Sequence, residues 1–355
     1  MQQRSFTYTS HPARVIFGSG TIARLPDELA LMGAERALIL CTAAQADAAE
    51  ALTARIGPRA VGVFAKAAMH TPVDVSTAAT DEARQRGADA VISLGGGSAI
   101  GLGKAIALRT DLPQIAVPTT YAGSEMTPII GETDGGQKRT QVTAKVLPEV
   151  VIYDVDLTMT LPAAMSGTSG INAIAHAIEA LYARDTNPVI TALALEAIAA
   201  LSRALPAIAQ NPQDRAARSE ALYGAWLCGT CLGAVGMALH HKLCHTLGGS
   251  FELPHAETHS VILPYALAYN APAIPEVMAR LRTVLGADPV GALYDLGRAV
   301  GAPASLAALG MPEAGVARAA DLALANPYWN PRPLEPRALH DLIARAYHGT
   351  RPQPE

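Results

Sequence analysis

The hydrophobic positions follow two different patterns along the 355-residue chain. Up to about residue 155, short apolar runs rich in β-branched residues alternate with stretches whose apolar positions recur at helical spacing. The runs are residues 36–42, 60–65, 88–97, 114–120 and 150–154, and the helical stretches between them are 43–56, 74–87 and 99–109. Apolar strands separated by helices are typical of a parallel sheet covered on both faces. We therefore expect an N-terminal α/β domain.

Residues 128–145 interrupt this alternation. Their centre, Asp134-Gly135-Gly136, tolerates positive φ, so the segment is expected to form a β-hairpin. From residue 161 onward the strands cease, and Pro and Gly separate helical stretches. The expected helices are residues 162–166, 170–184, 188–209, 214–237, 240–249, 256–270, 274–285, 290–301, 313–325 and 335–347. The pattern predicts an α/β dinucleotide-binding domain over residues 1–158 and an all-α catalytic domain over residues 159–355.

Composition narrows the class of protein. Half of the residues are hydrophobic, 16% are charged and the formal net charge is −4, so the chain can form a large core but has no basic surface for nucleic acid. We expect no continuous apolar run long enough to span a membrane, because glycines break the longest candidate, near residues 221–239. The first residues lack the apolar segment of a signal peptide. We expect a cytoplasmic protein without nucleic-acid or membrane partners.

Four cysteines are too few for a disulfide framework in a chain of this length. Cys228 and Cys231 form a CxxC pair, which raises zinc or redox chemistry. The pair lies within an apolar helical stretch, however, and no second pair accompanies it. We interpret all four cysteines as small core residues. They are Cys41, Cys228, Cys231 and Cys244.

A glycine-rich segment, GGGSAIGLGKAIAL (95–108), follows an expected strand and opens an expected helix. Glycines there let a phosphate approach the backbone, and a helix N-terminus offers free N–H groups. The segment is not the common dinucleotide fingerprint, because Ile100 stands where the third glycine belongs, and it is not a P-loop, because Ala105 follows Lys104. The alternative is a tight strand-to-helix turn without a ligand. We expect Gly96, Gly97 and Ser98 to contact a cofactor phosphate.

The segment PTTYAGSE (118–125) favours the phosphate-binding interpretation over the bare turn. It is a second loop rich in hydroxyl groups, and it follows the next expected strand. Hydroxyl groups at this place suit hydrogen bonds to phosphate or ribose. We expect Thr119, Thr120 and Ser124 to take part in cofactor binding.

Histidines are concentrated in residues 238–259, which hold five of the ten in the chain. Two of these pairs, His241 with His245 and His255 with His259, are four residues apart, and so are Asn172 and His176 in an earlier expected helix. Residues four apart share one helix face. One buried histidine is most often a hydrogen-bonded core residue, but polar groups are costly to bury unless they are paired or used. Their number here favours an active site.

Several motifs together resemble the iron-type alcohol dehydrogenase family, over about residues 10 to 350. They are GGGSAIGLGKAIAL, PTTYAGSEMTPI, KVLPEVVIYDVDLTMTLP, SGINAIAHAIEALYA and HHKLCHTLGGSFELPHAETHSVILPYALAYN. The resemblance implies the dehydroquinate synthase-like fold, with an α/β dinucleotide-binding domain, an α-helical domain and a homodimer. It also implies that Thr42, Thr127 and Lys145 join the cofactor-binding residues.

In metal-dependent members of the family, one Asp and three His hold a divalent ion. The resemblance places His176, His241 and His255 at the histidine positions and His245 beside the nicotinamide, but Asn172 replaces the Asp. Because an amide oxygen is a poorer ligand than a carboxylate for a hard ion, we expect a vestigial metal site and an enzyme that requires no metal. Those four histidines and Asn172 are the expected catalytic residues.

Two further departures concern the cofactor domain. Gly101 stands where many metal-dependent relatives have Asp. Thr42 stands near the position at which NAD-selective relatives carry an Asp. In those relatives the Asp binds the ribose hydroxyls and repels a 2′-phosphate. We therefore expect NADH as the cofactor, with NADPH also accepted.

The implied branch of the family reduces the carbon–carbon double bond of a small unsaturated dicarboxylate during the breakdown of aromatic compounds. A neutral Asn172 can hydrogen-bond a substrate carboxylate that an aspartate would repel. Lys242 and Arg332 are candidate carboxylate partners, and residues 326–333 form either a loop that closes the pocket or a rigid surface connection. The alternatives are a metal-dependent alcohol or aldehyde dehydrogenase of the same fold and, from another class, a nucleotide-binding sensor, which would not need the histidines.

Overall fold

The computed structural model describes residues 6–8, 10–11, 13–135 and 137–353. These residues form two compact units. One comprises Ser10–Leu161, and the other comprises Pro162–Glu355 together with the described residues before Ser10. Each unit is described by itself below.

The first unit is built on a six-stranded parallel sheet with the strand order β1-β8-β5-β4-β2-β3. The strands are β1 (Arg14–Gly18), β2 (Ala37–Leu40), β3 (Ala60–Phe64), β4 (Ala90–Gly95), β5 (Gln114–Pro118) and β8 (Val150–Asp154). Every residue of the inner strands β2, β4, β5 and β8 is buried. Their side chains are apolar in succession because helices cover both faces of a parallel sheet.

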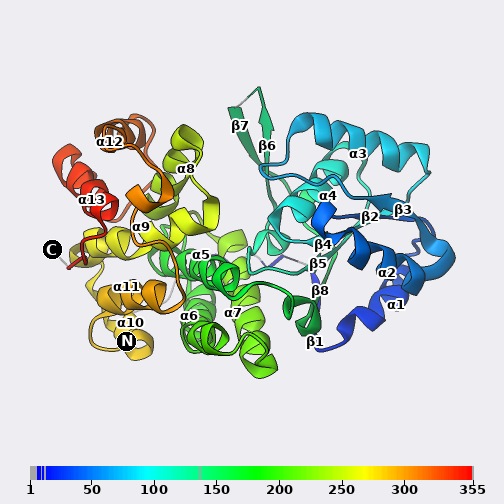
Figure 1. The fold of residues 1–355 in the computed structure, drawn as a ribbon, viewed down its shortest axis with the longest axis horizontal. Helices are drawn as coiled ribbons and strands as arrows, with labels where there is room; N and C mark the ends of the chain where they lie inside the picture. Colours follow the sequence, from blue (N-terminus) through cyan, green and yellow to red (C-terminus); the bar gives the residue numbers. More distant parts are fainter. Residues whose placement is uncertain (1–5, 9, 12, 136, 354–355) are drawn as a thin grey trace. The chain divides into compact units, whose positions relative to one another are not determined.

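Four helices provide this cover (Figure 1). Helices α1 (Leu25–Leu31) and α2 (Ala46–Ile56) pack in one apolar cluster with Ile39 of β2 and with side chains of β4, β5 and β8. Helices α3 (Val73–Gln85) and α4 (Gly97–Thr110) pack with Leu38 and Leu40 in another. Successive side chains of a strand point to opposite faces, so this division places the two helix pairs on opposite sides of the sheet.

The expected hairpin is confirmed as β6 (Ile129–Asp134) paired with β7 (Gln137–Val142) in antiparallel register. Gly136, in its turn, lies outside the described residues. Strand β1 and helix α1 were not among the predicted elements. The run RVIFG of β1 is only half buried, because β1 is an edge strand and pairs with β8 alone.

Among its described residues the second unit has helices joined by loops and no strand, and with the parallel α/β unit it confirms the predicted fold class. Its helices are α5 (Ala163–Tyr182), α6 (Pro188–Gln210), α7 (Arg215–Ala234), α8 (Leu239–Phe251), α9 (His255–Asn270), α10 (Pro275–Leu285), α11 (Pro289–Ala299), α12 (Gly315–Ala325) and α13 (Pro336–His348). Short 3-10 helices join elements in both units: Thr21–Arg24, Ala43–Gln45, Gly57–Arg59, Ser124–Met126, Ala144–Val146, Val155–Thr158, Ala271–Ala273 and Ala307–Leu309.

Helix α5 is continuous, although a break between residues 166 and 170 was expected. The glycines that suggested the break serve close packing instead. A Cβ atom at Gly167 would lie 2.6 Å from Val300, and one at Gly170 would lie 2.5 Å from Leu205. Every residue from Ser166 to Tyr182 is buried, so α5 is the central helix of this unit and supports its polar groups from within.

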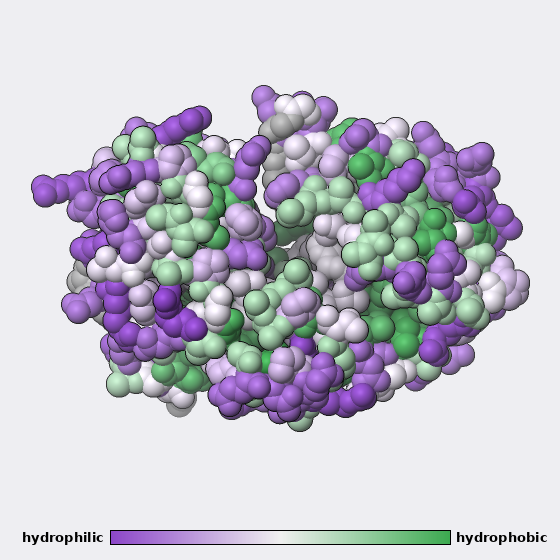
Figure 2. All heavy atoms as spheres, in the orientation of Figure 1, coloured by the Kyte–Doolittle hydropathy of each residue, from purple (hydrophilic) through white to green (hydrophobic). Residues whose placement is uncertain are grey.

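Helix α6 is long and apolar enough to span a membrane, and α7 with α8 would pass the same test only as a pair bent by 95°. Such a helix also occurs in the core of a soluble protein. Helix α6 packs between α5 and α7 and buries nine of its side chains. On the face drawn in Figure 2, hydrophilic side chains are spread over both units, with apolar patches between them.

Candidate active site

The glycine-rich turn lies where β4 ends and α4 begins. Gly96 is the N-cap of α4, and no side chain caps the helix, so its first N–H groups can bind an anion. A Cβ atom at Gly96 would meet Thr120 Oγ1 at 2.8 Å, whereas one at Gly97 would meet nothing within 4 Å. The space beside the Gly97 backbone is the room that a phosphate needs, and Ser98 occupies the next position of the same helical turn.

Gly101 lies one turn further along α4. A Cβ atom there would come within 2.5 Å of Thr71 Oγ1. Thr71 is itself buried and has a positive φ of 47°, so it cannot withdraw easily. The aspartate that many metal-dependent relatives carry at this position has no space in this chain.

A chain of polar side chains links the C-terminal ends of β2 and β5. Gln45 Nε2 donates to Thr119 Oγ1 at 2.9 Å, and Thr42 Oγ1 donates to Gln45 Oε1 at 3.2 Å. The backbone N–H of Thr119 donates to the carbonyl of Gly95 at 3.0 Å. The structure thus brings Thr42 and Thr119 to the glycine turn. Gln45 was not predicted, because no motif marks it.

Thr127 lies in the loop before β6, and its hydroxyl is already engaged. Its Oγ1 accepts from Lys104 Nζ at 2.9 Å and donates to the Ser124 carbonyl at 3.0 Å. Lys104 is fully buried and also donates to the carbonyls of Thr127 and Ile129. Burial lowers the pKa of Lys104 to about 7, although the nearby Glu125 raises it. This lysine therefore fixes the loop that carries Ser124.

Lys145 is the expected cofactor residue that the structure places apart from the turn. Its ammonium lies 2.8 Å from the carboxylate of Asp111, and both side chains are mostly exposed. Asp111 is the C-cap of α4, whereas the glycine turn is at the N-terminus of this helix. A 14-residue helix is about 20 Å long. The remaining predicted cofactor residues lie in the glycine turn and in the loops after β2 and β5.

Six histidines of α5, α8 and α9 form one connected cluster. The ring centroids of His176 and His241 lie 5.0 Å apart and are stacked, and His241 lies 5.0 Å from His259. His245 lies 6.0 Å from His241, and His255 lies 4.4 Å from His259. The structure therefore gathers all four predicted catalytic histidines around His240 and His259. His255 begins α9 and is exposed, unlike the buried His176 and His241.

A buried carboxylate that the sequence interpretation missed anchors this cluster. Glu179 lies on α5 with a fully buried side chain. Its Oε2 accepts from His241 Nδ1 at 2.7 Å and from Ala238 N at 2.8 Å. Its Oε1 accepts from His240 N at 2.7 Å and from Tyr182 Oη at 3.4 Å. The signal that could have revealed Glu179 is its spacing, because it follows Asn172 by seven residues and His176 by three on one helix face.

Burial determines the protonation of the inner histidines. The pKa values of His176, His240 and His259 are well below the usual range, because burial and the surrounding histidines disfavour the charged form. These imidazoles are therefore neutral at pH 7 and carry no spare proton. They can still donate an N–H hydrogen bond or offer a lone pair.

Several buried polar atoms of the cluster have no hydrogen-bond partner within the described part of the chain. They are Asn172 Oδ1, His176 Nδ1, His240 Nδ1, His241 Nε2 and His259 Nε2. Because a buried polar atom without a partner is costly, their concentration at one place points to a bound polar group or ion.

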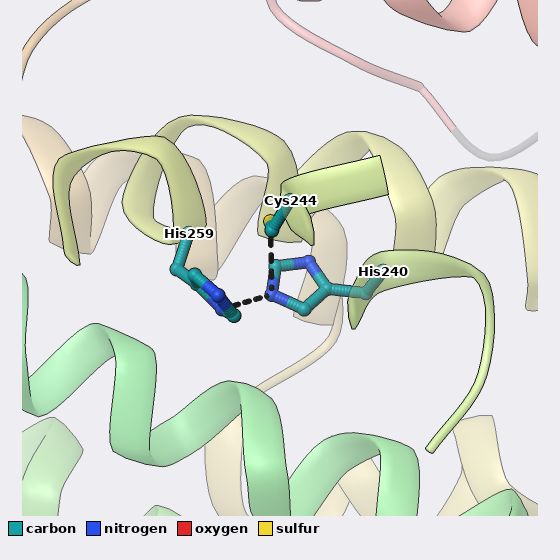
Figure 3. A group of neighbouring side chains, drawn as sticks. All are labelled: His240, Cys244 and His259. Atoms are coloured by element: carbon teal, nitrogen blue, oxygen red, sulfur yellow. Dashed lines mark hydrogen bonds between the residues drawn. The ribbon is translucent and has the colours of Figure 1, made fainter. Parts of the chain in front are cut away.

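His240, Cys244 and His259 lie closest together (Figure 3). His240 Nε2 is 2.9 Å from His259 Nδ1, and Cys244 Sγ is 3.7 Å from His240 Nε2. One ligand atom from each lies within 4.8 Å of the other two. Among the described His, Cys, Asp and Glu residues, no other three meet this condition, so the set His176, His241 and His255 does not. The two nitrogens and one sulfur suit a borderline or soft ion such as Fe²⁺ or Zn²⁺.

The other cysteines agree with the core interpretation. Cys41, Cys228 and Cys231 are buried thiols, and burial raises the pKa of Cys231 to about 12. Cys244 differs from them, because its sulfur faces an imidazole. Burial and the Glu179 carboxylate raise the pKa of its thiol well above the usual range.

Tyr328 connects the 326–333 loop to α8. Its hydroxyl lies 3.1 Å from His245 Nδ1, and Lys242 Nζ lies 5.7 Å from the centre of its ring. Burial of the phenol raises the pKa of Tyr328, and burial lowers the pKa of Lys242. The loop thus brings a hydroxyl, an ammonium and an imidazole to one place.

Arg332 is held by the end of α9. Its guanidinium donates to the Tyr269 carbonyl at 2.7 Å and lies 4.3 Å from the centre of the Tyr269 ring. Asn330 and Asn270 exchange two amide hydrogen bonds, of 3.0 and 2.7 Å. These contacts fix the loop against α9, which agrees with the rigid-connection interpretation, and they leave Lys242 as the better carboxylate candidate.

Comparisons with known proteins cover both units of the chain. The sequence model described as "Iron-containing alcohol dehydrogenase" matches residues 12–155, and that described as "Fe-containing alcohol dehydrogenase family, C-terminal" matches residues 166–347. A maleylacetate reductase of Rhizobium sp. strain MTP-10005 is 57% identical over 98% of this chain and 99% of the relative.

Two crystal structures show the same fold. The maleylacetate reductase of Agrobacterium tumefaciens superimposes with a TM-score of 0.96 at 55% identity, over 99% of this chain and all of the other. The iron-containing alcohol dehydrogenase of Corynebacterium glutamicum superimposes with a TM-score of 0.94 at 40% identity, over 98% of each chain.

The expectation that no metal is required is wrong. The matching family is iron-containing, and His240, Cys244 and His259 form a candidate metal site. The expectation rested on the missing carboxylate at Asn172. The structure shows that other positions provide a thiol, two neutral imidazoles and, beside them, the buried charge of Glu179.

Proposed function

The chain belongs to the iron-containing alcohol dehydrogenase family, and we propose that it is an oxidoreductase that reduces maleylacetate to 3-oxoadipate with NADH or NADPH. Eight curated maleylacetate reductases share 50–57% identity with it over 98–99% of this chain. That agreement over the full length carries the proposal and makes the alternative, a metal-dependent alcohol or aldehyde dehydrogenase, the less favoured function.

The reaction is a conjugate reduction. Hydride leaves C4 of the nicotinamide and bonds to the alkene carbon β to the ketone, while the π electrons move onto the ketone oxygen to give an enolate. A proton then bonds to the α carbon, and the ketone is restored. The protein must hold the substrate beside the nicotinamide, stabilise the enolate oxygen and deliver one proton.

The predicted catalytic residues divide these tasks. Asn172 and the neutral His176 offer buried atoms without a partner, and we assign them to hydrogen bonds with the substrate. His241 is fixed through its Nδ1 by Glu179, so its Nε2 is the atom that can act on the substrate. His245 lies at the exposed end of the cluster beside Tyr328. We assign proton delivery to His245 or His255, because these two histidines are exposed at the edge of the cluster and can exchange a proton with solvent.

The donor set fits a divalent ion. His240, Cys244 and His259 would hold it, since both imidazoles are neutral at pH 7 and a cation can take the place of the proton that they share. When bound, the ion supplies positive charge that stabilises negative charge developing nearby. His241 and His176 lie beside that set, with ring centroids 5.0 and 6.5 Å from that of His259, and their position supports a role in orienting substrate next to it.

The two substrate carboxylates need cationic or hydrogen-bonding partners. Lys242 and Tyr328 stand together beside His245, so we assign one carboxylate to them. The second carboxylate is assigned to Asn172, whose neutral amide does not repel it. An aspartate at that position would place two negative charges together.

We assign the cofactor phosphates to the glycine turn, with Gly96, Gly97, Ser98 and Thr120. Thr42 and Thr119 meet through Gln45, and Ser124 and Thr127 lie in the loop before β6. The residues that follow β2 are Cys41 and Thr42, neither of which is a carboxylate, and this supports acceptance of both NADH and NADPH. Lys145 can join this set only if it leaves Asp111.

The resemblance further supports a cytoplasmic homodimer that acts in the breakdown of aromatic compounds, without a nucleic-acid or membrane partner. The net charge of −4 agrees with the absence of nucleic acid from its function. Sedimentation of the purified protein at micromolar concentration tests the homodimer directly.

Oxidation of NADH in the presence of maleylacetate tests the function. We expect turnover with maleylacetate that exceeds turnover with simple aldehydes or, in reverse, alcohols, and a product with the mass of 3-oxoadipate. A protein that reduces aldehydes but leaves maleylacetate unchanged would refute the proposal in favour of the alternative.

A further inference from the structure

Gln45 crosses the end of the strand that carries the glycine turn. It follows β2, and its Nε2 donates to Oγ1 of Thr119, which follows β5. Strand β4 lies between β2 and β5 in the sheet, so the side chain reaches over the C-terminal end of β4. A Cβ atom at Gly95 would lie 2.6 Å from Gln45 Oε1. Gln45 therefore lies over the last residue of β4, directly before the turn at Gly96 and Gly97.

This place is also where the connections of the sheet diverge. The chain passes from β2 to β3 on one side and from β4 to β5 on the other. Helix α2, which follows β2, covers one face of the sheet, and α4, which follows β4, covers the opposite face. Parallel sheets bind nucleotides at the C-terminal ends of two strands whose connections diverge in this way. A dinucleotide whose phosphates lie at the start of α4 then brings its adenosine ribose to the end of β2, beside Thr42.

Gln45 sets the direction of two hydroxyl hydrogen bonds. Thr42 Oγ1 donates to Gln45 Oε1 at 3.2 Å, and Gln45 Nε2 donates to Thr119 Oγ1 at 2.9 Å. A hydroxyl group has one proton and two lone pairs. Thr42 gives its proton to Gln45 and can only accept a further hydrogen bond, whereas Thr119 accepts from Gln45 and keeps its proton to donate. Thr42 thus matches a ribose hydroxyl, and Thr119 matches a phosphate oxygen.

The two nicotinamide cofactors differ at the adenosine ribose. NADH has a 2′-hydroxyl, which can donate to Thr42. NADPH has a 2′-phosphate, whose deprotonated oxygens only accept. A 2′-phosphate can bond to Thr42 only by taking the proton that Thr42 donates to Gln45, and the Gln45 carbonyl oxygen then loses its donor. Such a loss costs free energy, so the arrangement disfavours NADPH without a negative charge.

We propose that Gln45 is a positioning residue that makes Thr42 a hydrogen-bond acceptor and Thr119 a donor, and that it thereby favours NADH over NADPH. NADPH is still accepted, with lower affinity, because the amide of Gln45 does not repel a phosphate. This inference rests on the cofactor site of the proposed function and adds the order of the two affinities.

The measurement is the dissociation constant of NADH and of NADPH, by calorimetric titration in the absence of substrate. At about pH 8 the 2′-phosphate is deprotonated. We expect the wild type to bind NADH roughly 3- to 10-fold more tightly than NADPH, which corresponds to one hydrogen bond. Gln45→Met keeps the length of the side chain but removes the amide, so Thr42 regains a proton for a phosphate and the preference should disappear.

Gln85→Met is the matched control. Gln85 is an exposed residue at the end of α3 in the same unit. This variant makes the same chemical change away from the glycine turn, and it should keep the wild-type ratio of the two dissociation constants.

A second pair of variants shows whether Gln45 acts through Thr42. Thr42→Val removes the hydroxyl group, so it should weaken the binding of NADH and leave the binding of NADPH unchanged. Once the hydroxyl group is absent, the further change Gln45→Met should not alter the ratio of the dissociation constants. If Gln45 acted independently of Thr42, the effects of the two substitutions on the ratio would add.

The inference is overturned by a wild type that does not prefer NADH, by a Gln45→Met variant that keeps the wild-type ratio, or by additive effects in the double variant. If Gln45→Met does not fold, the wild type and Thr42→Val still decide, because an equal loss of affinity for both cofactors in Thr42→Val would contradict the role of its hydroxyl. A protein that binds neither cofactor would refute both the inference and the proposed cofactor site. Maleylacetate turnover by the wild type tests the proposed reaction separately.

Discussion

Replacing Gly97 with alanine is expected to weaken NADH binding while the fold stays intact. A Cβ atom at this position would meet nothing within 4 Å, and Gly97 is not among the residues with positive φ. Alanine is favoured over glycine in helices by roughly 0.5–1 kcal/mol, so the free energy of unfolding should not fall. The open space is explained if a phosphate occupies it.

The size of the effect follows from the contacts that the added methyl group displaces. A hydrogen bond from the backbone to a charged phosphate contributes about 1.5–3 kcal/mol. Loss of one such bond raises the dissociation constant of NADH by roughly 10- to 150-fold. Quenching of protein fluorescence on NADH binding measures it, and thermal unfolding measures stability on the same sample.

Gly103→Ala is the matched control on the same helix. A Cβ atom there would collide with Ser93 Oγ on β4, so this variant should lose about 1–3 kcal/mol of stability through overpacking. The two substitutions are chemically identical and should have opposite signatures. If Gly97→Ala binds NADH with wild-type affinity, the assignment of the phosphate to this turn is refuted.

Three further outcomes follow from the site. Asn172→Asp should raise the affinity for Zn²⁺ and lower kcat/KM for maleylacetate through repulsion of a substrate carboxylate, and a neutral aldehyde substrate should not show the second effect. Tyr328→Phe removes one hydrogen bond and should lower kcat/KM by roughly 3- to 10-fold, with NADH affinity unchanged. Trp329→Phe is the control, because Trp329 is the exposed neighbour of Tyr328. Equal losses in both variants would contradict the role of the Tyr328 hydroxyl. In the folded protein the pKa of Lys104 is lowered from 10.5 to about 7, so above pH 7 the unfolded chain keeps a proton that the native chain has lost. The free energy of unfolding of the wild type, relative to that of Lys104→Met, should therefore rise between pH 7 and 9. The rise should be at most about 1.4 kcal/mol per pH unit. Urea unfolding of both proteins at each pH measures this difference, and a difference that does not change with pH would show that Lys104 titrates elsewhere.

The elements that the sequence predicted well are those whose side-chain pattern is set by local geometry. The inner strands are apolar in succession, and the glycine pair of the hairpin marks its turn. Strand β1 was missed, although the other edge strand, β3, has a similar partly buried pattern and was predicted. The false break in α5 has a tertiary cause: Gly167 and Gly170 allow the approach of Val300 and Leu205, which are distant in the sequence.

The site residues also divide into those that local sequence reveals and those that depend on contacts between distant segments. Asn172 and His176, like His241 and His245, could be grouped from helical spacing alone. Their meeting in one cluster depends on the packing of α5 against α8 and α9, which spacing does not specify. Gln45 and Tyr328 carry no motif, and their roles depend on single contacts, to Thr119 and to His245.

The wrong expectation about the metal shows that the charge around a site must be summed over the whole fold. Charge acts through space, and in a buried site its energy falls only as the inverse of the distance, with little screening by salt. The absence of a carboxylate at Asn172 therefore says little by itself about the charge around the histidines. Glu179 lies two helical turns along the same face and contacts His241 at 2.7 Å. A buried carboxyl group can thus act on a site without occupying a ligand position, so the ability of such a site to attract a cation is read from all its buried ionisable groups and not from the ligand positions alone.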